Sequence, residues 1–292
     1  MYETLPVVVG VDGSPGSDAA VQWAAAESLV RRTPVRIVHA YGLAPTRTAV
    51  PLYRSVPDAD LQLPRHVAEQ LVSNMITRAA ALGSASVGGA AIDGDAVGVL
   101  LNAARYGYEL VLGSRRLSAL GSAVHGSVSA AVAARATCPV VVVRGPAGRA
   151  DERAAVVVGI DGSHRSQALL EYAFDYASRR DIGVRAVLCW HPDLLAVMRR
   201  RAEPPEPERV DAWLAEALAG WQQKYPDVVV HREVVREHPI AGLVRASTAQ
   251  NLLVVGSHGH RALASALLGS TTQGVLHHAT GPVAVVPTHN LR

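Results

Sequence analysis

Lysine is almost absent from this sequence, and its scarcity excludes two large classes of nucleotide-binding protein. The only lysine is Lys224, which follows Gln223. A P-loop requires lysine before Ser or Thr, and a protein kinase requires a strand lysine that pairs with phosphates. No two glycines are separated by a single residue, and no Gly-x-Ser-x-Gly segment occurs. These absences exclude the dinucleotide-binding fingerprint and the nucleophile elbow of α/β hydrolases.

Long apolar runs, cysteine and unbalanced charge are scarce as well. The longest apolar runs, such as Val140–Val143, are far below the roughly 18 residues that span a bilayer, so we expect neither a membrane span nor a signal peptide. Cys138 and Cys189 are the only cysteines and lie in apolar, strand-like segments, which favours core packing and a cytoplasmic location. The 28 basic and 25 acidic residues are interspersed, so nucleic-acid binding is not indicated.

The chain contains an internal repeat. A Val-Val-Val-Gly-x-Asp-Gly-Ser segment occurs around Asp12 and again around Asp161, an offset of 149. A Leu-Val-x-Gly-Ser segment contains Gly113 and recurs at Gly256, an offset of 143. Self-similarity of this kind, in a chain long for one domain, indicates duplication.

The repeat sets the expected domain boundaries. We predict one domain over residues 1–146 and a second over 153–292, with a linker at 145–153 that carries Gly, Pro and charge. The six-residue difference between the two offsets is expected in the proline-rich stretch 42–64.

Each half alternates strands with helices, and its first strand is a continuous apolar run. Such runs are expected where helices cover both faces of a sheet. The alternation predicts an α/β fold of two tandem, doubly wound, parallel five-stranded sheets flanked by helices. The first helix is expected to begin near Ser17, a favourable N-cap residue. In doubly wound sheets, ligands bind at the carboxyl ends of the strands.

A glycine pattern follows the fourth strand of the second half. Gly256 is followed by two residues and Gly259, and nine further residues separate Gly259 from Gly269 and Ser270. Together with the Asp-Gly-Ser segments, this pattern resembles the ATP-binding loop of the universal stress protein family, and the similarity covers nearly the whole chain twice. The resemblance implies a Rossmann-like, tandem protein of stress responses that binds ATP, with or without magnesium.

The physical chemistry of the loop supports the same interpretation. Glycine permits positive φ and a close approach of backbone amides to an anion. A helix that begins near Ser270 directs unpaired amides at that anion, and the hydroxyls of Ser270 and Thr271 add donors. His258 lies within the loop and is included in the candidate site. The alternative is that these glycines only form turns.

The resemblance also implies roles at the ends of the first two strands. In the family, the aspartate that closes the first strand lies against the nucleotide, and the end of the second strand flanks the adenine. This implies that Asp12 and Asp161 lie beside the ligand and that Ala40 and Cys189 line the base pockets. The aspartates could instead form Asx turns in Asp-Gly-Ser, and both roles can hold together.

The loop of the first half departs from the pattern. Gly113 and the Gly126-Ser127 pair match, but Arg116 stands where the second glycine is expected. A side chain there restricts φ and can obstruct backbone approach, whereas its guanidinium could grip a phosphate directly. We expect the second half to bind more tightly.

The remaining features favour binding over catalysis. No residues resemble a nucleophile and base held in register, and the His258 and His277 regions give no metal-ligand pattern shared by both halves, so we expect neither an enzyme nor a metal site. The alternatives are a nucleotide-independent scaffold and a slow ATPase. Family members pair through their last strands, which implies a pseudo-dimer of Val140–Val143 with Val283–Val286, or a homodimer.

Overall fold

The structure is a computed structural model that describes residues 5–42, 58–84, 86–114, 127–144, 155–163, 165–190, 207–249, 251–259 and 267–288. The chain divides into two compact units, Met1–Val132 with Ala136–Val143, and Ala133–Arg135 with Arg144–Arg292. Each unit is described by itself. The predicted boundaries at 146 and 153 fall outside the described residues and stay a prediction.

The first domain contains a parallel five-stranded sheet. Its strand order is β3-β2-β1-β4-β5, and every pairing between neighbours is parallel. The strands are β1 (Val7–Gly10), β2 (Val35–Tyr41), β3 (Val87–Asp93), β4 (Glu109–Gly113) and β5 (Val140–Val143). The helices are α1 (Pro15–Arg31), α3 (Asp58–Ala81), α4 (Ala96–Ala104) and α5 (Ser127–Arg135).

The second domain repeats this topology. Its order is β8-β7-β6-β9-β10, again with parallel neighbours. The strands are β6 (Ala155–Ile160), β7 (Gly183–Cys189), β8 (Val230–Val235), β9 (Leu252–Gly256) and β10 (Val283–Val286). The helices are α6 (Ser166–Ser178), α8 (Pro207–Lys224), α9 (Pro239–Ala246) and α10 (Ser270–His278). The predicted fold class is confirmed.

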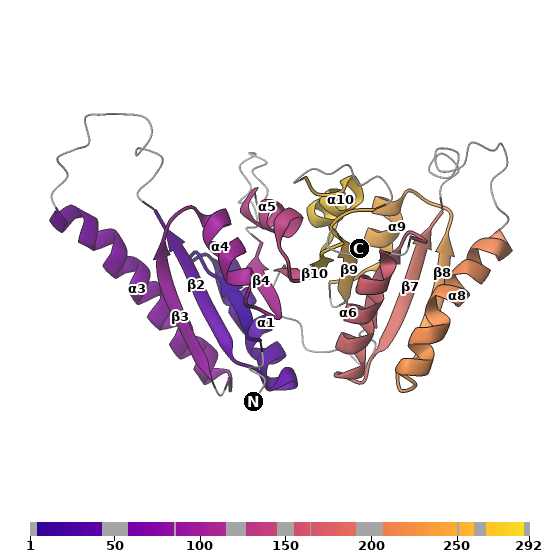
Figure 1. Cartoon of the computed structure of the whole chain (residues 1–292), viewed down its shortest axis with the longest axis horizontal. Helices are drawn as coiled ribbons and strands as arrows, with labels where there is room; N and C mark the ends of the chain where they lie inside the picture. The colour runs from indigo at the N-terminus through magenta and orange to yellow at the C-terminus, as the bar shows by residue number, and fades with distance from the viewer. Residues whose placement is uncertain are drawn as a thin grey trace. The chain divides into compact units, whose positions relative to one another are not determined.

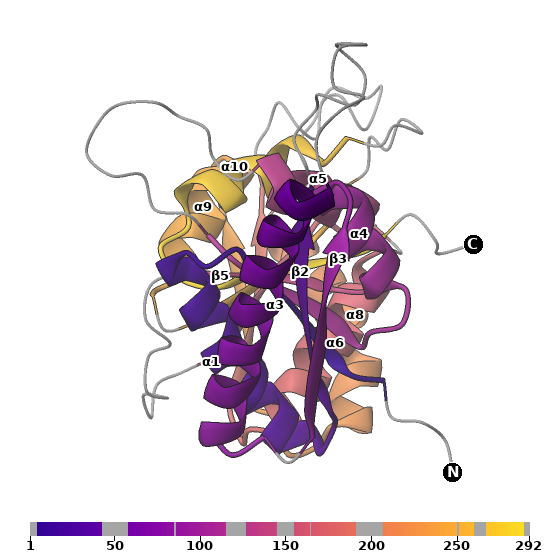
Figure 2. The ribbon, with the colours of Figure 1, turned by 90° about the vertical axis from the view of Figure 1, so that its left-hand side faces the viewer.

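Helices cover both faces of each sheet. In the first domain α1 and α3 pack on one face and α4 on the other, as Figure 2 shows. In the second domain α6 and α8 share one face, while α9 and α10 pack together on the other (Figure 1). Because both faces are covered, the central strand β1 has no polar side chain, and Val7, Val8 and Val9 are fully buried. No helix in the described part of the chain is long and apolar enough to cross a membrane.

The predicted N-cap residue of the first helix, Ser17, was wrong by three residues. The helix begins at Pro15, with Ser14 as the N-cap residue. The Ser17 hydroxyl instead donates to Asp12 Oδ1 at 2.8 Å and accepts the Asp12 amide at 2.8 Å. Proline suits the first helical position because its ring fixes a helical φ and it has no amide hydrogen to leave unpaired.

The extra six residues of the first half lie in a helix. Helix α3 has 24 residues and its counterpart α8 has 18. The proline-rich stretch therefore includes the first turns of α3, and Pro64 lies inside that helix.

The single phenylalanine of the chain forms the centre of an aromatic cluster in the second domain. Phe174 of α6 is fully buried, and its ring centroid lies 5.9 Å from that of Trp221 and 5.7 Å from that of Tyr225. These contacts join α6 to α8.

Replacing Phe174 by Ala is expected to lower the free energy of unfolding of the second domain by about 3–5 kcal/mol, because it removes a buried ring and leaves a cavity. Urea titration followed by tryptophan fluorescence measures the change. Val229→Ala is the control, since Val229 is 62% exposed and its truncation should shift the unfolding free energy by no more than about 0.5 kcal/mol. Equal midpoints for the two variants would contradict the assignment of Phe174 to the core.

Candidate functional site

The glycine pattern of the second domain forms a loop that is closed at its base. Strand β9 ends at Gly256, and α10 begins at Ser270. The Gly269 amide donates to the Ser257 carbonyl at 2.9 Å, and the Thr272 hydroxyl donates to the Gly256 carbonyl at 2.5 Å. These two bonds hold the start of α10 beside the carboxyl end of β9.

The amino end of α10 offers backbone amides to a ligand. The first amide to reach a helical acceptor is that of Gln273, which donates to the Gly269 carbonyl at 2.9 Å. The three preceding amides have no acceptor within the helix, as in every helix N-terminus, and carry a partial positive charge. Ser270 is exposed and Thr271 half-buried, so both predicted hydroxyl donors lie at an accessible end.

The loop glycines are not used for positive φ, and Gly256 is the one that is tightly packed. None of Gly256, Gly259 and Gly269 has a left-handed φ, so the expected use of positive φ was wrong at these positions. A Cβ added to Gly256 would lie 3.0 Å from Thr288 Cγ2, and one added to Gly269 would lie 3.4 Å from the Ser257 carbonyl oxygen. Glycine therefore provides space at the end of β9, whereas the contact at Gly269 is an ordinary one that leaves room for a side chain.

Thr288, which the sequence analysis did not select, fixes the loop to the last strand. Its hydroxyl donates to the His258 carbonyl at 3.0 Å and accepts the His258 amide at 3.1 Å. Its own amide donates to the Ser257 hydroxyl oxygen at 3.0 Å. Thr288 is 1% exposed, so these bonds form in a dry environment. The parallel pairing of β9 with β10 was the available signal, because it brings the residues after both strands to the same edge.

The His258 imidazole also serves the loop's own structure. Nδ1 lies 3.1 Å from the Ser257 hydroxyl oxygen, and Nε2 lies 2.6 Å from the Leu267 carbonyl oxygen. His258 therefore joins the two ends of the nine-residue segment. Among the described residues, no group of three or more His, Cys, Asp or Glu side chains could hold a metal ion.

Asp161 lies beside the loop and also forms the Asx turn. Its Oδ1 accepts the amide of Ser163 at 3.0 Å and the hydroxyls of Ser163 and Ser166 at 2.6 and 3.2 Å. A Cβ added to the exposed Gly259 would lie 3.3 Å from Asp161 Oδ2. The structure thus brings the end of β6 and the glycine loop together.

Cys189 lies at the end of β7 and its thiol faces α9. A Cβ added to Gly242 would lie 2.6 Å from Sγ, and the Pro239 carbonyl lies 3.9 Å from it. Burial and the carboxylates of Glu237 and Glu233 raise the pKa of the Cys189 thiol to about 11. The thiol is therefore neutral at physiological pH, and its predicted place beside adenine stays a prediction.

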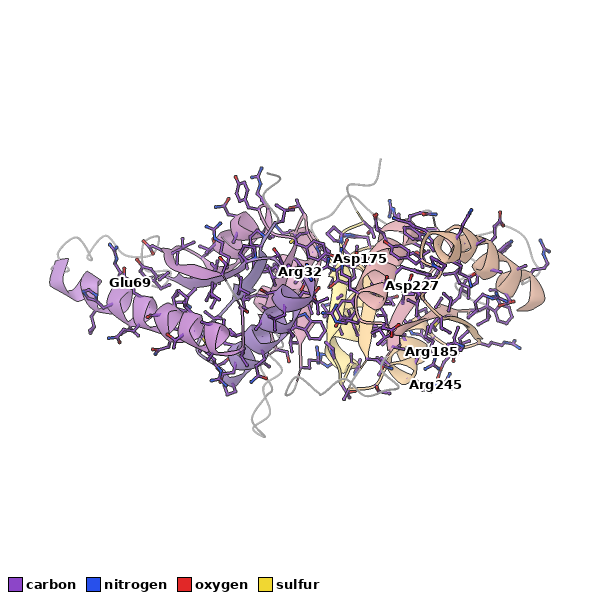
Figure 3. The ribbon with its side chains drawn as sticks, turned by 90° about the horizontal axis from the view of Figure 1, so that it is seen from below. Arg32, Glu69, Asp175, Arg185, Asp227 and Arg245 are labelled. Carbon is purple, nitrogen blue, oxygen red and sulfur yellow. The ribbon has the colours of Figure 1, made fainter. Side chains whose placement is uncertain are left out.

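Two charged pairs lie along α9. Arg185 of β7 pairs with Glu233 and donates to the Ala246 carbonyl at 3.0 Å, while Arg245 Nη2 lies 2.9 Å from Glu237 Oε2. Figure 3 labels both Arg185 and Arg245 in the second domain. The bond from Arg185 to the Ala246 carbonyl joins β7 to the carboxyl end of α9, whereas Cys189 faces its amino end at Pro239.

The first domain reproduces part of this arrangement. Ser14 donates its amide to Asp12 Oδ1 at 3.0 Å, so the Asx turn is present here too. Gly113 packs directly on the backbone of Gly16 in α1, and a Cβ on Gly113 would clash there. Ala40 is half-buried on β2 and pairs with Ile92.

The rest of the first loop is only partly described. Ser127 is the first residue of α5. Arg116 and Gly126 lie outside the described residues. The roles assigned to these three positions stay predictions.

Comparison with known proteins identifies the family. The family model for the universal stress protein family matches residues 3–144 and 153–287. A universal stress protein of Mycolicibacterium smegmatis is 37% identical over 286 residues, which cover 96% of each chain. The chain belongs to the universal stress protein family. A universal stress protein of Mycobacterium tuberculosis is also 37% identical, over 285 residues and 96% of each chain.

A solved structure supports the fold of this universal stress protein. The crystal structure of a universal stress protein from Archaeoglobus fulgidus matches with a TM-score of 0.72 and 18% identity, and the match covers 98% of this chain and 100% of that one. At this identity the likeness establishes the fold alone.

Thr288→Val is expected to loosen the loop of the second domain, because Val keeps the shape of Thr but cannot bond to the His258 amide and carbonyl. Unsatisfied buried groups cost about 1–3 kcal/mol, so the amides of residues 256–259 should exchange with deuterium roughly 10-fold or more faster. Hydrogen-exchange mass spectrometry measures this. Thr288→Ser keeps the hydroxyl, so the same amides should stay protected from exchange. Equal protection in the Val and Ser variants would contradict the role of the Thr288 hydroxyl in holding the loop.

The Cys189 thiol is expected to resist modification in the folded protein. In a Cys138→Ser background, reaction with a disulfide reagent at pH 8 should be roughly 100-fold slower than after denaturation, because the folded pKa is about 11 and the ordinary value is 9.0. The neutral thiol stabilises the fold fully below pH 9, and this contribution is lost as pH rises through 11. Rapid labelling of folded protein would contradict the raised pKa of this half-buried thiol.

Proposed function

We propose that this universal stress protein binds ATP at the loop between β9 and α10, with or without magnesium. The observation that carries the proposal is the meeting of Ser257, Gly259 and Gly269 beside the amino end of α10. This arrangement leaves amides and the Ser270 hydroxyl at an exposed edge where a phosphate chain can lie.

The expected contacts are sufficient for useful affinity. A charge-assisted hydrogen bond contributes about 1.5–3 kcal/mol, and a helix N-terminus adds about 0.3–1 kcal/mol. Four or five such contacts, after the cost of association, are consistent with micromolar binding of a triphosphate. Asp161 Oδ2 lies where it could share a magnesium ion with phosphate oxygens.

The biological role follows from the family. We infer that the protein acts in the cytoplasm in stress responses, and that nucleotide occupancy changes its conformation or its choice of partner. Pairing through Val140–Val143 and Val283–Val286, within the chain or between two copies, belongs to the same proposal. Each of these strands stands at one end of its domain's strand order.

Gly269→Asp is expected to abolish ATP binding in the second domain without harming the helix. Gly269 is the N-cap residue of α10, with φ −58° and ψ 143°, a position and conformation that Asp favours. Its carboxylate would occupy the anion position and repel phosphate, so the dissociation constant for ATP should rise at least about 100-fold. Gly269→Asn is the matched control, because it provides a neutral cap of the same size.

Isothermal titration of ATP into wild type, Gly269→Asp, Gly269→Asn and Gly126→Asp measures these affinities, with magnesium and with a chelator. Retained affinity in both aspartate variants would reject the loop as the site, and a wild type that binds no ATP would favour the scaffold alternative. If ADP forms from ATP no faster with the protein than in buffer alone, the ATPase alternative is rejected. Light scattering of the same samples, with and without ATP, tests whether occupancy changes the oligomeric state.

A further inference from the structure

At each of two positions in the repeat, one copy of the domain has arginine and the other has glycine. The copy that has the arginine differs between the two positions. In the second domain Arg165 precedes α6, and its Nη1 donates to the Gly259 carbonyl at 2.9 Å. The repeat pairs Arg165 with Gly16 and Gly259 with Arg116. The first copy thus has arginine on the loop and glycine on the helix, and the second copy has the reverse.

The described part of the first domain supports the correspondence of these positions. A Cβ added to Gly16 would lie 2.9 Å from the Ser114 carbonyl oxygen, so the first turn of α1 packs against the residue after β4. In the second domain the corresponding helix start contacts the loop through the Arg165 side chain. The helix start therefore meets the beginning of the loop in both copies.

The Arg165 guanidinium has a weak partner in the structure as it stands. The Gly259 carbonyl is a neutral acceptor on an exposed residue, and the bond to it is solvent-exposed. A phosphate oxygen at the same place would be a stronger partner, because a guanidinium binds phosphate through charge-assisted, often bidentate hydrogen bonds.

The site also contains a carboxylate, whose negative charge would repel a bound phosphate unless a cation lay nearby. The Asp161 carboxylate lies close to Gly259, with Oδ2 3.3 Å from where a Cβ would be. A phosphate chain laid along the loop would meet this carboxylate, and a guanidinium beside the same residue would offset the repulsion. Arg165 supplies that guanidinium, because its Nη1 donates to the Gly259 carbonyl.

We propose that Arg165 binds the terminal phosphates of the nucleotide in the second domain, so that this site prefers a nucleoside triphosphate to the monophosphate. The inference rests on the proposed function and extends it to a residue outside the glycine pattern. In the first copy the arginine stands instead at position 116, which the repeat pairs with Gly259. The position of the arginine is therefore one difference between the two copies.

Titration of ATP and AMP into wild type and Arg165→Gln tests the assignment. Loss of one charge-assisted contact should weaken ATP binding about 10- to 100-fold and leave AMP binding within about 2-fold, because AMP lacks the terminal phosphates. Arg165→Lys keeps the positive charge, so its affinity for ATP should fall less than that of Arg165→Gln. Unchanged ATP affinity in Arg165→Gln, or equal losses for ATP and AMP, would overturn the proposal.

The arrangement of the first copy, with glycine at the helix start and arginine on the loop, can be introduced into the second domain by mutation. Gly259 is exposed and has no left-handed φ, and the nearest neighbour of an added Cβ is the end of the Asp161 side chain at 3.3 Å, which can shift to make room. Arg165→Gly should weaken ATP binding, and the double variant Arg165→Gly with Gly259→Arg should recover at least about 10-fold of that loss by supplying the guanidinium from the loop. A double variant that binds ATP no more tightly than Arg165→Gly would contradict the proposal that an arginine at either position can bind the phosphates.

The outcomes separate this inference from the proposed function. Wild type that binds neither nucleotide would reject the ATP site altogether. Wild type that binds ATP while Arg165→Gln matches it would leave the site intact and reject only the role of Arg165. AMP affinity serves as the fold check in every variant, because the base and sugar contacts do not involve the guanidinium.

Discussion

The bond between the Gly269 amide and the Ser257 carbonyl is the contact on which the rest of the second site depends. It joins the amino end of α10 to the carboxyl end of β9, and thereby sets where the helix directs its unpaired amides. In a parallel sheet all strands end at the same edge, so the residues after β6, β9 and β10 can reach this point. Asp161 and Thr288 reach it from the two neighbouring strands.

The two copies share one scaffold and differ in how the loop is supported. In the second copy the Thr288 hydroxyl holds both polar groups of the His258 backbone, whereas the corresponding residue of the first copy, Gly145, has no hydroxyl. Duplication permits this divergence, because the strand order and the Asx turn at the end of the first strand are the same in both domains.

Most of the fold could be predicted from the sequence because its signals are periodic and repeated. The valine runs, the alternation of strands and helices and the offsets of the repeat determined a pair of doubly wound sheets. The start of α1 was misplaced, because Ser17 is a suitable cap by type but its hydroxyl is bound to Asp12. The six extra residues were assigned to a proline-rich stretch, and the structure adds them to the length of α3.

The sequence by itself determined the family, the duplicated architecture and the glycine spacing of the loop, since each depends on residue types at fixed separations along the chain. Only the tertiary structure decided which distant residues complete the site. Thr288 and Arg165 lie 30 and 94 residues from the loop positions they contact, and no local pattern links them. Their contacts follow from strand order and crossover geometry, which bring separate segments to one edge of a sheet.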